Sequence, residues 1–87
     1  MREAVIVSTA RTGLAKSHRG GFNNTGGAAM AGHAIEHSIK RAGVDPAEVD
    51  EVVLGCGTPQ GTTGNNIGRI AAMKAGCPVT TTGVTVS

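Results

Sequence analysis

Short runs of apolar and β-branched residues alternate with longer stretches of helical periodicity, and this alternation constrains the fold more than any other feature. The apolar runs fall at residues 4–10, 51–56 and 82–87, and β-branched side chains favour pleated strands. Residues 26–42 and 64–75 carry small or apolar side chains spaced by threes and fours, which predicts helices. The order strand, helix, strand, helix, strand predicts two successive βαβ units, so the expected fold class is α/β with a parallel sheet.

The predicted helices carry start and stop signals. Asn24 or Thr25 can cap the first helix, and Gly43 fits the left-handed position after its last turn. A separate single turn begins at Asp45, where a capping carboxylate precedes Pro46. These signals leave a long loop between the first strand and the first helix, and such loops are more often functional than idle.

The material for a hydrophobic core is thin. The 87 residues include 14 Gly, one Phe and neither Tyr nor Trp, and aromatic side chains are the largest contributors to buried area. The second predicted helix is apolar almost all round, which indicates burial on several sides. We therefore expect residues 1–87 to be an incomplete part of one domain. The last predicted strand ends at Ser87. Ligands of parallel α/β sheets bind just beyond the carboxyl ends of the strands, so the residues that carry the function are expected to follow this strand.

Charge and cysteine content exclude several kinds of partner. The formal charge is +2, from 8 Lys and Arg against 6 Asp and Glu, which is too weak to indicate nucleic acid or an anionic membrane. No run approaches the roughly 20 apolar residues of a membrane span, and no secretory signal precedes the first strand. Two cysteines without a CxxC pair favour a reducing compartment, and we expect the protein to be cytoplasmic.

Single motifs give no catalytic or metal site. The H-x-x-E-H pattern from His33 to His37 lies opposite the apolar stripe of its helix, which predicts an exposed helix face rather than a zinc site. The spacing G-x-G-x-x-x-G from Gly55 is one residue too long for a dinucleotide loop. Cys56 is more typical of a small buried residue than of a nucleophile, and Cys77 follows the unfavourable end of a helix. We expect no catalytic residue, metal ligand or cofactor-binding residue in this chain.

Several segments, taken in order, resemble the amino-terminal part of the thiolase family. The resemblance begins with the strand that runs into Ala10, Arg11 and Thr12, and it ends with the run into the last strand. Between them lie the segments Gly21-Phe22, Arg41-Ala42-Gly43, Val44-Asp45-Pro46, Glu51-Val52-Val53-Leu54-Gly55 and residues 64–72. The ordered series covers the whole chain and is more specific than any one of its parts.

The resemblance implies the amino-terminal domain of a thiolase-fold acyl-CoA C-acyltransferase, which forms or cleaves 3-ketoacyl-CoA through a cysteine-bound acyl group. It places the nucleophile just after Ser87 and the other catalytic groups in a carboxyl-terminal half, so this chain is expected to be inactive scaffold. The implied substrate of the complete enzyme is a coenzyme A thioester. The implied partners are the carboxyl-terminal remainder and further copies in a homodimer or homotetramer.

Two alternatives remain open from the sequence. The chain could be a self-contained βαβαβ binding module, or part of another thiolase-fold enzyme such as a ketoacyl synthase. The bare end of the last strand and the apolar second helix argue against the module, and the Ala10-Arg11-Thr12 opening favours a thiolase.

The resemblance also implies a dimer interface, because thiolases dimerise through the amino-terminal half. An exposed edge of a parallel sheet would otherwise invite aggregation. We therefore expect six residues at or beside a twofold axis: Ile67, Ile70, Met73, Val84, Thr85 and Val86.

Overall fold

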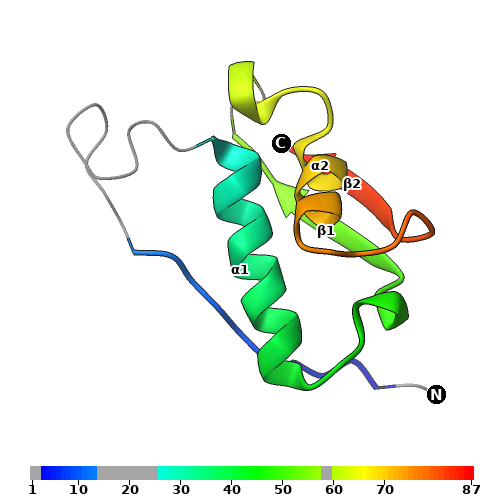
Figure 1. The fold of residues 1–87 in the computed structure, drawn as a ribbon. Coiled ribbons are helices and arrows are strands. Elements are labelled where there is room, and N and C mark those ends of the chain that lie inside the picture. The colour runs from blue at the N-terminus through cyan, green and yellow to red at the C-terminus, as the bar shows by residue number, and fades with distance from the viewer. Residues whose placement is uncertain (1–2, 14–25, 58–59) are drawn as a thin grey trace.

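The part of the chain that the structure describes forms one βαβ unit, and a further helix that precedes it in the sequence packs beside it (Figure 1). The computed structural model describes residues 3–13, 26–57 and 60–87. Its elements, with η marking a short 3-10 helix, are in order α1 (Gly27–Ala42), η1 (Pro46–Glu48), β1 (Glu51–Gly55), η2 (Gly61–Thr63), α2 (Ile67–Lys74) and β2 (Thr82–Val86).

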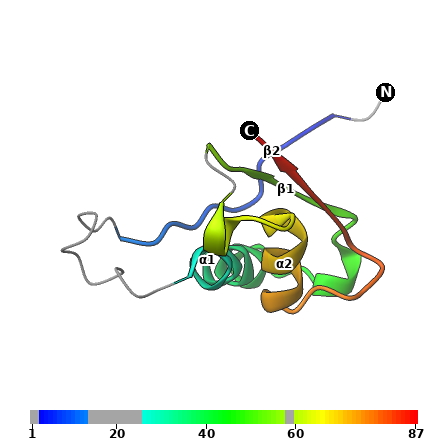
Figure 2. The same cartoon turned by 90° about the horizontal axis from the view of Figure 1, so that it is seen from above.

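The sheet consists of β1 and β2, which run parallel and are joined by α2. The register runs from Glu51 opposite Thr82 to Gly55 opposite Val86. Both helices lie on one side of the sheet (Figure 2), where α2 packs against both strands and α1 packs against α2. The predicted α/β class is therefore confirmed.

The core surrounds α2. Ile67 is 2% exposed and Ala71 is fully buried. The sheet covers one side of α2 and α1 covers another, so the chain itself supplies part of the partner surface that this apolar helix requires. The two helices approach closely because Gly32 has no side chain: a Cβ there would lie 2.9 Å from the Cβ of Lys74.

Two glycines let α2 lie directly on β2. A Cβ added to Gly68 would lie 2.5 Å from the carbonyl oxygen of Val84, and one added to Gly83 would lie 2.6 Å from the backbone nitrogen of Arg69. Ordinary carbon contacts begin near 3.5 Å. Helix and strand are therefore in backbone contact, and a methyl group at either position would force them apart.

Residues 4–10 do not form the third strand that the sequence predicts. They run as an extended segment along α1 (Figure 1) and pair with neither strand. Arg41 holds this segment by donating to the Thr9 carbonyl oxygen at 3.0 Å. Three of its apolar side chains are 72 to 88% exposed: Val5, Ile6 and Val7. A β-branched run has strand propensity, but a strand also needs a neighbour's backbone in register, so the described residues contain one βαβ unit instead of two.

The boundaries of α1 and η1 agree with the sequence. Gly43 ends α1 in the left-handed conformation with φ of 72°, and its amide donates to the carbonyl oxygens of Ile39 and Lys40. The carboxylate of Asp45 accepts from the Ala47 amide at 2.9 Å and caps η1. Asn24 and Thr25, the predicted caps of α1, lie outside the described residues, as does the Gly-Phe loop. The N-cap residue of α1 is Gly26, so no side chain caps this helix from that position.

The second helix begins one turn later than predicted, at Ile67 instead of residue 64. Asn65 and Asn66 both adopt φ of 55°, and this left-handed backbone cannot continue into a right-handed helix. Two consecutive asparagines are a sequence signal for such a turn, since asparagine tolerates the conformation better than other non-glycine residues.

Candidate functional site

The carboxyl edge of the sheet, where ligands of parallel α/β sheets bind, joins three elements. The amide of Cys56 donates to the Val86 carbonyl oxygen at 2.8 Å and extends the pairing of β1 and β2 beyond Gly55. The amide of Gly68 donates to the hydroxyl of Thr85 at 2.9 Å. The ends of both strands and the first turn of α2 therefore meet at this edge.

A closed set of hydrogen bonds joins α2 to β2 there. The Thr85 hydroxyl accepts from the Gly68 amide and donates to Asn66 Oδ1 at 2.7 Å. Asn66 Nδ2 donates in turn to the Gly83 carbonyl oxygen at 3.0 Å. The Gly68 amide is among those that have no partner within their own helix, and Asn66, the N-cap residue, makes no capping bond with its side chain. A residue of the strand therefore caps the helix.

The opposite end of β2 is held through Arg69. Its guanidinium donates to the carbonyl oxygens of Thr81 and, at 3.2 Å, of Val79. Thr81 is 1% exposed, and its hydroxyl donates to the Val49 carbonyl oxygen at 2.8 Å. The side chains of Asn66 and Arg69 thus bond to β2 and to the residues just before it.

Neither cysteine is placed as an activated nucleophile. Cys56 is half-buried, and its thiol donates to the Thr63 carbonyl oxygen at 4.0 Å. Cys77 is buried, and this burial raises the pKa of its thiol. A raised pKa keeps the thiol protonated and unreactive.

Of the two histidines in the H-x-x-E-H pattern, His33 is exposed on α1 and His37 is half-buried. The ring centroids of His33 and His37 are 4.3 Å apart, while Glu36 pairs with Lys40 at 2.9 Å. Hydrogen bonding and charge from that ammonium lower the pKa of Glu36. Within residues 3–13, 26–57 and 60–87, no three His, Cys, Asp or Glu side chains form a group that could hold a metal ion.

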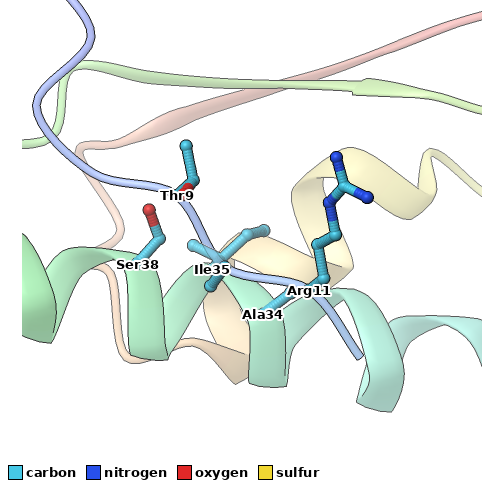
Figure 3. Close-up of a pocket in the computed structure, with 6 residues that line it drawn as sticks. Thr9, Arg11, Ala34, Ile35 and Ser38 are labelled. Atoms are coloured by element: carbon cyan, nitrogen blue, oxygen red, sulfur yellow. The ribbon is translucent and has the colours of Figure 1, made fainter. Parts of the chain in front are cut away.

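Two of the cavities that described residues line border α1. The one shown in Figure 3, of about 500 Å³, lies between α1 and the amino-terminal segment. Ser38 points toward the segment that carries Thr9, and the Arg11 guanidinium extends away from the helix. Among the described residues, no carboxylate, imidazole or thiol lines this cavity. The second, of about 330 Å³, lies between α1 and the carboxyl edge, and its lining is mostly apolar, including Met30, Ala34, Leu54, Cys56 and Ile67.

The six residues expected at a dimer interface do not share one surface. Ile67 is buried under the sheet, and Thr85 faces α2 through its hydrogen bonds. Val84 and Val86 are 40 and 48% exposed and point to the opposite face of β2, because successive strand residues alternate. Met73, 43% exposed, and the half-buried Ile70 belong to α2.

Sequence reasoning missed the link from Thr85 to Asn66. Each residue has a local signal: a second asparagine before the helix, and a threonine two places after a glycine in the strand. Only the fold brings them together, since they are 19 positions apart.

Comparison with known proteins identifies the family. The family model of the thiolase N-terminal domain matches residues 4–87. The chain is 34% identical over 87 residues to a 3-ketoacyl-CoA thiolase of Bacillus subtilis (strain 168), covering 100% of this chain and 22% of the relative. It is 49% identical over 74 residues to an acetyl-CoA acetyltransferase of Rhizobium meliloti (strain 1021), covering 85% of this chain and 18% of that protein.

The fold comparison agrees. The crystal structure of the Bacillus anthracis acetyl-CoA acetyltransferase superposes with a TM-score of 0.83 at 38% identity, covering 94% of this chain and 20% of that one. The chain belongs to the thiolase family and corresponds to part of its amino-terminal domain. It spans about a fifth of the length of the relatives that it matches. None of the helices described is long and apolar enough to cross a membrane.

Proposed function

We propose that this chain is amino-terminal scaffold of an acyl-CoA C-acyltransferase that forms or cleaves 3-ketoacyl-CoA through a cysteine-bound acyl group. The observation that carries the proposal is the thiolase family match over residues 4–87. The relatives described above are named as thiolases and acetyltransferases, which favours the thiolase reaction over that of a ketoacyl synthase.

The geometry supports a scaffold role. Cys56 is half-buried at the end of β1, and burial raises the pKa of the Cys77 thiol, so neither is placed as an activated nucleophile. The resemblance to the thiolase family implies a nucleophile a few residues after Ser87. A helix amino end lowers the pKa of a thiol, and backbone amides stabilise a thioester oxyanion. Coenzyme A thioester is the substrate of the complete enzyme, and this chain binds no cofactor of its own.

The proposal includes the partners of the chain. It works with the carboxyl-terminal remainder of the same enzyme, in a cytoplasmic homodimer or homotetramer. The outer edge of β2 is free of pairing within the described residues, and Val84 and Val86 lie exposed on that strand. Pairing of this edge with a second copy, with Met73 and Ile70 nearby on α2, would remove the exposed edge.

The site of acylation tests this function. The complete enzyme is incubated with acetyl-CoA, digested at low pH and mapped by mass spectrometry. We expect the acetyl thioester on a cysteine beyond Ser87, and unchanged labelling in a variant that carries Cys56→Ser and Cys77→Ser. An acetyl group on Cys56 or Cys77, or no acylation of any residue, would contradict the proposal.

A further inference from the structure

We propose that Thr85 and Asn66 form a positioning pair that sets the carboxyl end of β2 against the amino end of α2. Through this end they set the orientation of the residues that follow the strand. The inference rests on the proposed function, since it is the nucleophile of the acyltransferase that would follow. Neither residue is assigned contact with substrate; both act through the backbone.

The first observation is that the hydrogen bonds of the pair form a closed ring. The Thr85 hydroxyl accepts from Gly68 at 2.9 Å and donates to Asn66 at 2.7 Å. Asn66 donates to Gly83, two residues before Thr85 on the same strand, at 3.0 Å. The ring ties two points of β2 to the first turn of α2, so the strand can neither slide nor rotate without breaking a bond.

The second observation is the backbone of Asn66. Its φ of 55° and ψ of 69° are left-handed, a conformation that carries a free-energy cost in any residue with a side chain. An N-cap asparagine stabilises a helix most simply by bonding to that helix with its own side chain, and Asn66 makes no such bond. Its side chain reaches across to β2 instead, so the arrangement serves the placement of the strand.

The third observation is the close packing of α2 on β2. Gly68 packs so closely on β2 that a Cβ would lie 2.5 Å from the Val84 carbonyl oxygen. Thr85 directly follows Val84. Val86 and Ser87 come next, and the proposed function places the nucleophile a few residues after Ser87. Since a misplacement of about 1 Å at a reacting group can cost roughly 100-fold in rate, rigidity at this point has a use in catalysis.

The test compares four variants of the complete enzyme. Thr85→Val removes the hydroxyl and keeps the shape, and Thr85→Ser keeps the hydroxyl. Asn66→Gly removes the side chain while favouring φ of 55°. Thr82→Val is the matched control, because its hydroxyl donates to the Asp50 carbonyl oxygen at 3.3 Å at the other end of β2.

The measurements are kcat and KM for thiolysis of acetoacetyl-CoA, normalised to titrated active thiol, and the pH dependence of inactivation by iodoacetamide. We expect Thr85→Val and Asn66→Gly to lower kcat at least tenfold with KM within threefold, and to shift the pH profile of inactivation. Thr85→Ser should return kcat to within threefold of the parent enzyme, and Thr82→Val should leave both quantities unchanged.

A role in stability alone would lower the amount of active enzyme but leave kcat per active thiol and the pH profile unchanged, and that result would overturn the inference. So would a Thr85→Ser variant as slow as Thr85→Val. If Thr85→Val does not fold, Asn66→Gly decides the question by the same criteria. An inactive parent enzyme would instead count against the proposed function, so the two failures are distinguishable.

Discussion

Replacement of Gly83 by alanine tests the backbone contact between α2 and β2. The new Cβ would lie 2.6 Å from the Arg69 nitrogen and 3.0 Å from its Cβ, which is about 0.9 and about 0.5 Å closer than an ordinary contact near 3.5 Å. Both atoms belong to the first turn of α2, which cannot swing aside as a flexible side chain would. The helix must therefore move off the strand, and such overpacking typically costs about 1–3 kcal/mol.

An opposing effect sets the net magnitude. Alanine loses less backbone entropy than glycine on folding, which favours the variant by roughly 0.5–1 kcal/mol. Gly55→Ala isolates that effect, because Gly55 lies in β1 with nothing within 4 Å of an added Cβ. We therefore expect Gly83→Ala to lower the free energy of unfolding by about 1–2 kcal/mol, whereas Gly55→Ala leaves it unchanged or raises it.

The assay is urea unfolding of the complete enzyme, with hydrogen exchange of the β2 amides as the local measurement. Gly83→Ala should lower the urea midpoint and speed exchange in β2, and Gly55→Ala should do neither. Equal midpoints and equal exchange for the two variants would refute the argument, because they differ only in what the added methyl group meets.

Three further predictions concern the described side chains. Cys56→Ser and Cys77→Ser should each leave kcat within about threefold of the parent value, a change of under 1 kcal/mol in the activation barrier. A hundredfold loss in either variant would show that this chain contributes a catalytic group. Because burial raises the pKa of the Cys77 thiol, its contribution to stability is fully present below the ordinary thiol pKa of about 8.5 and is lost as the pH rises above it. Urea unfolding at neutral and alkaline pH should show this loss in the parent enzyme and not in Cys77→Ser; a loss of equal size in both would exclude Cys77 as its source. Met73→Asp places a charge on an exposed part of α2 and should lower the mass of the oligomer measured by light scattering, while the control Val79→Asp, at a residue 73% exposed, should not; an unchanged mass for Met73→Asp would remove α2 from the interface.

The local elements were predictable because their signals are local. Gly43 stops α1 in a conformation that glycine adopts freely, and Asp45 caps the following turn one residue before a proline. The two β-branched runs that pair were also found within one residue of their observed ends. Each of these features depends on a few adjacent residues, which is what a sequence displays directly.

Pairing and depth were not predictable in the same way. Residues 4–10 have a strand composition, but whether they pair depends on a neighbouring backbone that composition does not reveal. The six expected interface residues came from the family resemblance, the apolar second helix and the edge of the last strand. None of these signals shows that Ile67 is buried or that Thr85 bonds to α2. The link from Thr85 to Asn66 joins residues distant in sequence, and no periodicity marks it.

Complementation with the rest of a thiolase shows whether this chain is thiolase scaffold. The chain is co-expressed with the carboxyl-terminal four-fifths of a thiolase relative that begins where this chain stops, and thiolysis of acetoacetyl-CoA is followed by loss of the substrate. We expect no activity from either piece alone, and thiolysis together with a co-purifying complex when both are present. A folded chain that binds no complementary piece, and a mixture that cleaves no acetoacetyl-CoA, would contradict the claim that this chain is thiolase scaffold.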